Sequence, residues 1–234
     1  MNFIVSSATL LRHLQNISGV LNSSNTLPIL DNFKFSIKGN ELEISATDLE
    51  TTMITKLEVQ SEEDGAVAVP AKLVLEVLKS LPDQPCTFKV NGDNHKIEIS
   101  YDNGRSEMSG FNGAEFPKLP KIENQSTINI SGEIVSNAIN RTLFAAGNDE
   151  LRAAMSGVYC EFSDNEIIFV ATDAHKLVRY KRNDAKSTDS SDFILPKKPL
   201  NMLKANLSGK EDIKLEYNQS NAVFTFNELK LVCR

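Results

Sequence analysis

The residue pair that most resembles catalytic machinery is Asp173 and His175, because a carboxylate that orients an imidazole is a common arrangement for moving protons. The two residues stand two positions apart in a predicted strand-to-strand turn. Asp48 occupies an equivalent place earlier in the chain, where Leu49 and Glu50 follow it and no histidine does. We therefore interpret the shared aspartate as the cap of a turn, accepting from nearby backbone N–H groups, and we predict no catalytic residue.

The remaining histidines and the cysteines also lack a chemical pattern. They are widely scattered: His13, His95, His175, Cys86, Cys160 and Cys233. No CxxC pair and no metal-ligand spacing is present, and neither a phosphate-binding GxxxxGK[ST] loop nor a dinucleotide-binding GxGxxG loop occurs. We expect no metal and no cofactor, and the cysteine usage predicts a reducing cytoplasm.

Composition indicates an ordinary globular protein. Of the 234 residues, 41% are hydrophobic and 24% are charged. The N-terminus has no signal-peptide pattern, and no apolar run approaches the roughly 20 residues that span a bilayer. The net charge of −6, taken alone, argues against a general nucleic-acid binder.

An internal repeat organises the chain. Residues 39–48 and 163–173 each have a polar turn, an apolar strand pattern and then Ala-Thr-Asp, so that Thr47 and Thr172 lie 125 positions apart. A second pair of anchors, Pro70 and Pro196, lies 126 positions apart, and each proline ends a short strand and opens a helix. Two anchors with consistent offsets predict one module written twice.

Each copy has the pattern of an α+β module with two helices packed on antiparallel sheet. Apolar spacing predicts helices over 7–21, 70–81, 131–144 and 196–207, with serines 7 and 131 as the favoured N-caps of the opening helices. Alternating patterns predict strands over 32–37, 96–100 and 222–226. We place one module at 1–120, a linker at 121–127 and a second module at 128–234, which we expect to be truncated near its last strand.

The predicted helices are basic although the chain is acidic. Seven basic residues stand against two acidic ones in the helices, Arg12, Lys72, Lys79, Arg141, Lys197, Lys198 and Lys204 against Glu76 and Glu133. The remaining residues carry 18 basic and 29 acidic side chains. This predicts a helix-lined surface that faces phosphates, and the scarcity of aromatic residues favours duplex DNA over single strands. The alternative is that solvated helix surfaces simply tolerate lysine.

At this point the chain resembles the bacterial β sliding clamp family, the processivity subunits of the replicative DNA polymerase. The matching stretches run in order along the chain: TLPIL at 26–30, ATDLE at 46–50, VPAK at 69–72, EFP at 115–117, GVY at 157–159 and ATDAHKL at 171–177. Each stretch is weakly specific alone, and the ordered set is highly specific. The resemblance implies a tandem repeat of DNA-clamp modules, of which this chain holds the first and second, with the third domain absent.

The resemblance further implies a ring of two subunits with three modules each, a homodimer in the full-length protein. Such a ring slides on double-stranded DNA and holds it by enclosure, so its phosphate contacts can be weak and blind to sequence. The implied contacts are the seven basic helix residues and Arg152, whereas the loop 22–25 holds no basic residue. The implied subunit-interface edge is Arg105, Ser106, Glu107 and Met108.

The family also docks the replicative polymerase, the clamp loader and repair proteins through short peptides. The implied pocket residues here are Met155, Thr172, Ala174, His175, Lys176 and Leu177. The family often has glycine where Ala174 stands and arginine where Lys176 stands. We expect a non-enzymatic processivity factor with a half-built pocket. The alternative is a protein-interaction module that does not encircle DNA.

Overall fold

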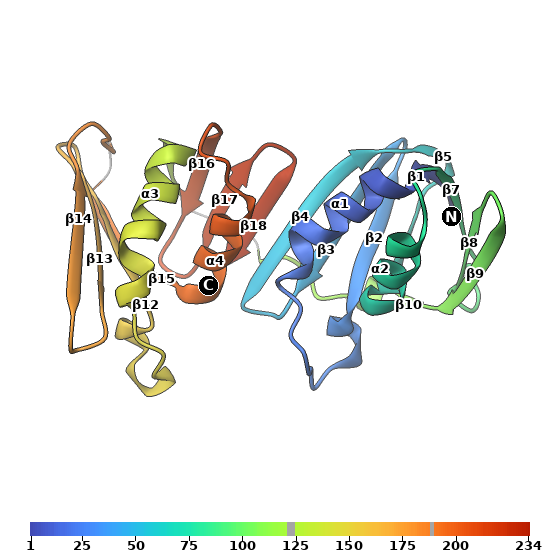
Figure 1. Ribbon diagram of the computed structural model, residues 1–234, viewed down its shortest axis with the longest axis horizontal. Helices are drawn as coiled ribbons and strands as arrows, with labels where there is room; N and C mark the ends of the chain where they lie inside the picture. Colours follow the sequence, from blue (N-terminus) through green and yellow to red (C-terminus); the bar gives the residue numbers. More distant parts are fainter. Residues whose placement is uncertain (121–124, 188–189) are drawn as a thin grey trace. The chain divides into compact units, whose positions relative to one another are not determined.

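The structure is a computed structural model that describes residues 1–120, 125–187 and 190–234. The predicted linker 121–127 therefore lies largely outside the described residues. The chain divides into two compact units, Met1–Pro120 and Lys121–Arg234. Figure 1 labels the elements of both units.

The first unit contains two antiparallel sheets and a pair of helices. Its elements are β1 (Asn2–Ser6), α1 (Ser7–Ser18), η1 (Pro28–Asp31), β2 (Asn32–Lys38), β3 (Glu41–Thr47), β4 (Thr51–Glu58), β5 (Gln60–Glu63), β6 (Gly65–Pro70), α2 (Ala71–Ser80), β7 (Pro85–Val90), β8 (Lys96–Tyr101), β9 (Gly104–Ser109), β10 (Phe111–Asn112) and η2 (Gly113–Glu115). The strand orders are β5-β1-β7-β8-β9 and β10-β6-β2-β3-β4.

The second unit repeats this plan. Its elements are β11 (Ser126–Ser131), α3 (Gly132–Thr142), η3 (Leu143–Ala145), η4 (Glu150–Met155), β12 (Gly157–Phe162), β13 (Ile167–Thr172), β14 (Leu177–Arg182), β15 (Ser191–Pro196), α4 (Lys197–Asn206), β16 (Asp212–Tyr217), β17 (Ala222–Phe226) and β18 (Leu229–Cys233). The strand orders are β11-β16-β17-β18 and β14-β13-β12-β15.

The two units share one topology. When β5 and β10 are set aside, the strand orders of the first unit map onto those of the second, with β1 matching β11 and β6 matching β15. Helices α1 and α2 pack against each other, and so do α3 and α4 (Figure 1). The predicted α+β module written twice is confirmed. Sequence reasoning missed the strand before each first helix, although its period-2 pattern was readable, since Phe3 and Val5 are buried and alternate with polar or exposed neighbours.

The start of α1 differs from the prediction by one residue. Ser6, not Ser7, is the N-cap, because its hydroxyl oxygen accepts from the Thr9 N–H at 3.2 Å. The Ser7 hydroxyl instead donates to the Pro82 carbonyl at 2.8 Å and accepts from the Gln84 N–H at 3.1 Å, so it joins the helix to a distant segment. Ser131 caps α3 as predicted, accepting from the Glu133 N–H at 3.2 Å.

Each unit has its own apolar core between helices and sheets. In the first unit, Phe3 and Phe88 stack with ring centroids 4.8 Å apart, and Phe35 lies beside both. In the second unit, the buried rings of Phe162 and Phe169 lie edge to face with centroids 6.4 Å apart. Burial of such rings stabilises each unit by roughly 25 cal/mol per Å² of apolar area. Among the described residues, none of the helices is both long and apolar enough to cross a membrane.

Candidate functional site

The basic residues predicted to meet DNA lie on the helices. The four α-helices carry all seven of them, and their acidic residues are Glu76 and Glu133. Five of the seven side chains are exposed: Arg12, Lys72, Lys79, Arg141 and Lys204. Lys197 and Lys198 are half-buried. The exposed helix surfaces in each unit therefore carry an excess of positive charge within a chain whose net charge is −6.

Arg141 combines exposure with a fixed position. Its guanidinium lies 5.5 Å from the ring centroid of Tyr180 on β14. A cation over an aromatic face at a partly exposed site is worth about 0.5–1 kcal/mol. The stacked ring holds the guanidinium at the end of α3 while leaving its N–H donors available to solvent or to an anion.

Lys197 makes hydrogen bonds within the second unit that the sequence did not predict. Its ammonium donates to the Ala146 carbonyl at 3.1 Å, to the Gly147 carbonyl at 3.3 Å and to the Asn148 Oδ1 at 2.6 Å. An ammonium has three donors, so these acceptors can use all of them. The loop residues 146–148 therefore compete with any phosphate for this side chain.

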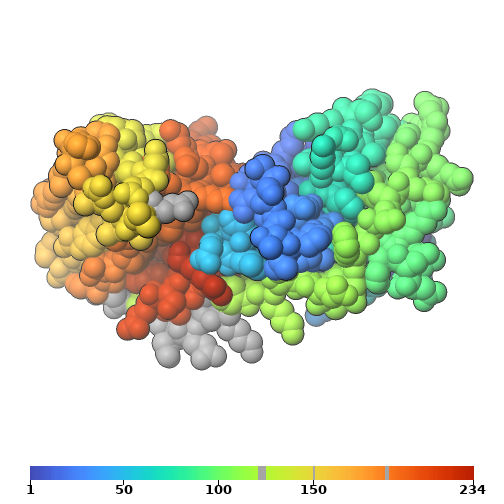
Figure 2. All heavy atoms as spheres, turned by 90° about the horizontal axis from the view of Figure 1, so that it is seen from below, coloured from blue at the N-terminus to red at the C-terminus, as the bar shows by residue number. Residues whose placement is uncertain are grey.

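Arg152 lies in η4, on a loop at the surface of the second unit. Its Nε is 3.1 Å from the Asp149 carboxylate, and both side chains are exposed. The neighbouring Leu151 side chain is 96% exposed. This part of the chain is yellow in Figure 2. An exposed ion pair of this kind contributes little to stability, so the guanidinium remains accessible to an anionic ligand.

The turn between β13 and β14 is held by side-chain hydrogen bonds. The Thr172 hydroxyl accepts from the Ala174 N–H at 3.1 Å and donates to the Lys176 carbonyl at 2.8 Å. The Asp173 carboxylate accepts from the His175 and Lys176 N–H groups at 3.0 and 2.9 Å. The predicted capping role of the shared aspartate is confirmed. Its carboxylate is committed to the turn and does not act as a partner for the His175 ring.

Lys176 adds a charge contact to this turn. The Lys176 ammonium donates to the other oxygen of Asp173, and this bond, together with the two backbone N–H donors, holds the pKa of the Asp173 carboxyl well below its ordinary value. Ala174 has φ +73°, a left-handed backbone conformation that non-glycine residues adopt at a cost. The turn thus presents His175, Lys176 and Leu177 outward, and the Leu177 side chain is 66% exposed.

A hollow of about 340 Å³ joins this turn to the η4 loop. Its lining residues are Phe144, Ala146, Gly147, Asn148, Asp149, Arg152, Met155, Asp173, His175, Lys176 and Lys197. The structure therefore brings Met155, His175 and Lys176 together, as the resemblance implied. Thr172, Ala174 and Leu177 belong to the same turn but do not line the hollow.

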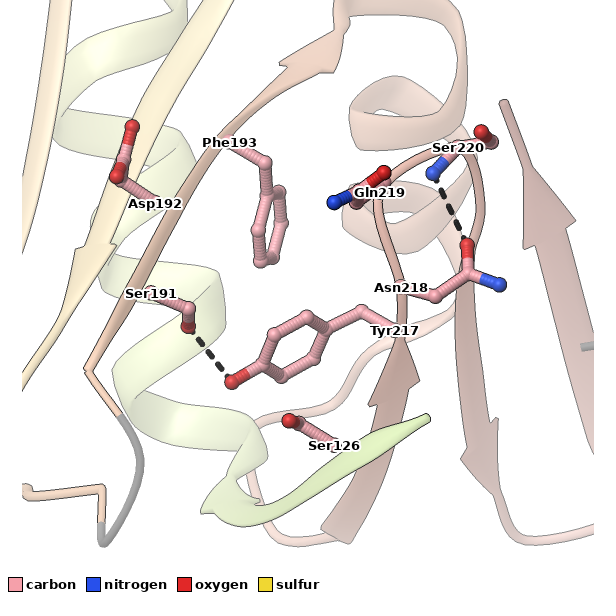
Figure 3. Close-up of a pocket in the computed structure, with 8 residues that line it drawn as sticks. All are labelled: Ser126, Ser191, Asp192, Phe193, Tyr217, Asn218, Gln219 and Ser220. Carbon is pink, nitrogen blue, oxygen red and sulfur yellow. Dashed lines mark hydrogen bonds between the residues drawn. The ribbon is translucent and has the colours of Figure 1, made fainter. Parts of the chain in front are cut away.

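A second hollow in this unit contains none of the predicted residues. It measures about 570 Å³, and its lining residues are Ser126, Ser191, Asp192, Phe193, Tyr217, Asn218, Gln219 and Ser220. Figure 3 shows the Ser191 hydroxyl bonded to the Tyr217 oxygen, a distance of 2.6 Å. The rings of Phe193 and Tyr217, with centroids 5.0 Å apart, lie beside it. No short motif marks these residues, because they come together only when β15 and β16 fold near each other.

The predicted interface residues lie on β9, an edge strand of the first unit. Arg105 and Glu107 are exposed, and Ser106 is half-buried. The Lys96 ammonium bonds Glu107 at 2.6 Å and lowers the pKa of that carboxyl. The Met108 side chain is buried, because alternate residues of a strand point to opposite faces. Met108 can therefore join the interface through its backbone but not through its side chain.

The cysteines and acidic residues form no metal centre among the residues that the structure describes. All three thiols are free and buried. Burial raises the pKa of the Cys160 thiol and raises that of Cys233 to about 12. Thiols of this kind are unreactive, since the thiolate is the nucleophile.

Comparison with solved structures identifies the class of fold. The chain superposes on a DNA polymerase III beta subunit of Eubacterium rectale with a TM-score of 0.94 and 25% identity, and on a sliding clamp of Pseudomonas aeruginosa bound to griselimycin with a TM-score of 0.93 and 25% identity. Both matches cover 100% of this chain and 64% of the other. The two units are therefore DNA-clamp modules.

Sequence comparison identifies the family. Residues 1–120 match the N-terminal domain of the DNA polymerase III beta subunit, and residues 129–234 match its central domain. The beta sliding clamp of Staphylococcus epidermidis is 26% identical over 245 residues, which cover 100% of this chain and 64% of that protein. That of Synechococcus elongatus is 28% identical over 229 residues, 94% of this chain and 60% of that protein. The chain belongs to the DNA polymerase III beta subunit family and spans somewhat less than two thirds of these relatives.

Proposed function

We propose that this chain supplies two modules of a non-catalytic clamp that encircles duplex DNA and slides on it during replication in the cytoplasm. The observation that carries the proposal is the basic charge of the exposed helix surfaces in two family-matched modules. Phosphate contacts of this type are independent of base sequence, and weak contacts permit sliding. Topological enclosure then supplies the persistence that the contacts lack.

Ring closure would use the β9 edge of the first unit. An edge strand offers unpaired backbone N–H and C=O groups to a strand of another subunit. Arg105 and Glu107 at this edge are exposed and of opposite charge, which favours one register of pairing. The partner edge would belong to a second subunit, giving a homodimeric ring.

The test of enclosure compares retention of the protein on circular duplex DNA with retention on the same DNA after linearisation. A clamp stays on the circle and leaves the linear form by sliding off its ends. Equal release from both forms would contradict encirclement. Salt adds a second readout, because contacts to phosphate weaken as the salt concentration rises, whereas topological retention persists.

The second part of the proposal is that the hollow and the adjacent turn dock short peptides of the polymerase, the clamp loader and repair proteins. Met155 and Leu177 supply apolar surface, and His175 and Lys176 supply a polar rim. The likeness to a Pseudomonas aeruginosa clamp that binds griselimycin makes griselimycin a suitable probe.

We expect Leu177→Ser to weaken griselimycin binding about tenfold, because removing one apolar anchor side chain from an interface typically costs an effect of this order. Leu49→Ser is the matched control, because Leu49 is also exposed but sits on the turn of the first unit. Calorimetric titration checks both variants. Equal weakening by both variants, or by neither, would place the binding surface elsewhere.

The alternative is an interaction module that does not encircle DNA, and the exposed Leu151 and Leu177 favour it. Replacing Lys72, Lys79 and Lys204 by glutamate separates the two functions. In a clamp, the salt-sensitive binding to phosphate weakens and griselimycin binding is kept, whereas an interaction module has no salt-sensitive DNA binding to lose.

A further inference from the structure

We propose that Lys197 is a positioning residue that shapes the peptide-docking hollow by holding the loop 146–148. The inference rests on the proposed docking function. It assigns to Lys197 a role different from the phosphate contact that its charge suggests. The three acceptors of its ammonium, at 3.1, 3.3 and 2.6 Å, all lie in this loop.

The place of Lys197 on its helix supports this role. It is the first residue of α4, directly after the N-cap Pro196. The positive end of a helix dipole disfavours a cation there. Two backbone carbonyls and an amide oxygen offset that cost, because each directs negative partial charge at the ammonium. The side chain is also half-buried, so the contacts are less screened than those of a surface lysine.

The held loop is connected directly to the hollow. While the Gly147 carbonyl accepts from Lys197, the Gly147 N–H donates to the Met155 carbonyl at 2.7 Å. A Cβ on Gly147 would lie 3.4 Å from the Met155 carbonyl oxygen and 3.8 Å from the Asp173 Cα, so this residue packs between the two walls. Lys197 therefore fixes the peptide planes that set the distance between Met155 and the Asp173 turn.

Lys197 and Lys204 on α4 therefore have different roles. A phosphate could take the Lys197 ammonium only by displacing its loop acceptors, so the loop contacts lower its availability to DNA. Lys204, about two turns further along in the last turn of α4, is exposed to solvent and lies where a cation is favoured by the dipole. Lys197 therefore serves the hollow, and Lys204 serves the phosphate surface.

The experiment compares Lys197→Met, Lys197→Arg and Lys204→Met in the 234-residue chain, with two readouts. The first is hydrogen exchange of the Gly147 amide, and the second is the methyl resonance of Met155. We expect Lys197→Met to speed exchange about tenfold and to shift the resonance, since the hydrogen bonds that hold the loop are lost. Lys197→Arg should restore both in part, because arginine also donates to carbonyls, and Lys204→Met should change neither.

A second variant changes an acceptor in the loop instead of the lysine. Asn148→Ala removes one of the three acceptors without altering α4, and it should change both readouts in the same direction by a smaller amount. The inference is overturned if Lys197→Met leaves the exchange and the resonance unchanged, or if Lys204→Met alters them equally. Neither readout requires DNA or a peptide, so failure of the proposed clamp function would be seen in the retention assay and not here.

Discussion

The turn after β3 in the first unit and the turn after β13 in the second are built from the same hydrogen bonds. Thr47 and Thr172 each accept from the N–H two residues on, both at 3.1 Å, and each donates to the carbonyl four residues on. Asp48 accepts from the Glu50 and Thr51 N–H groups as Asp173 does from its own neighbours. The residue after each aspartate has positive φ, +81° at Leu49 and +73° at Ala174.

The surroundings of the two turns differ. Thr47, Thr51 and Thr52 are buried, and the Thr47 and Thr52 hydroxyls share a hydrogen bond of 2.7 Å. In the second copy Lys176 stands where Thr51 does, and it is exposed along with Leu177. The two copies therefore share the backbone of the turn, and the side chains of the second copy are exposed.

The sheet edges of the two units show a related difference. In the first unit β10 pairs with β6 at Ala68, which is fully buried. In the second unit the equivalent residue on β15 is Ile194, whose side chain is 40% exposed. In the described part of the chain β12 is the strand paired with β15. The same position in the module is thus core in one copy and surface in the other.

The largest expected difference in the free energy of unfolding is between two variants that each lack the hydroxyl of a turn threonine. Thr47→Val should lower the free energy of unfolding by about 1–3 kcal/mol, because the buried Thr52 hydroxyl and the part-buried Leu49 N–H each lose a partner. Thr172→Val should cost about 0.5 kcal/mol, since water can replace the lost hydroxyl. Urea denaturation followed by circular dichroism measures both. Equal losses would show that burial does not distinguish the turns.

A smaller effect on the free energy of unfolding is expected when glycine replaces a residue that has positive φ. Ala174→Gly should raise the free energy of unfolding by about 0.5–1 kcal/mol, because glycine adopts this conformation without the steric cost of a Cβ. Leu49→Gly should gain less or lose stability, since the Leu49 side chain is 44% exposed and its covered part is given up. Urea midpoints of the two variants check this, and destabilisation by Ala174→Gly would be the contrary result.

The smallest effect concerns the titration of the second turn. The folded-state pKa of Asp173 is lowered, so its contribution to stability is present above the ordinary carboxyl pKa of about 3.9 and is lost as pH falls through the folded value. Lys176→Met should raise the pKa of Asp173, while the two backbone donors keep it partly lowered. Carbon NMR of the carboxyl checks this. Lys181→Met is the control, because Lys181 pairs with Glu166, and an equal shift there would contradict the assignment.

Much of this architecture was readable from the chain itself. Helical spacing predicted all four α-helices to within a few residues, because an apolar face recurs every 3.6 residues whatever lies opposite. The Ala-Thr-Asp repeat predicted two modules, and the short range of a capping carboxylate predicted the aspartate's role in the turn. These features depend on residues that are close along the chain, so they could be predicted without knowledge of the fold.

Which side chains contact one another could not be predicted from the sequence, because these contacts depend on how the elements pack. It placed Lys197 against the loop 146–148, turned the Met108 side chain into the core and made Ser6 rather than Ser7 the cap of α1. It also built the hollow between η4 and the Asp173 turn. In each case the residues that make the contact are far apart along the chain or come from different elements. A residue's type limits which contacts it can make, whereas the packing of distant segments selects the one it makes.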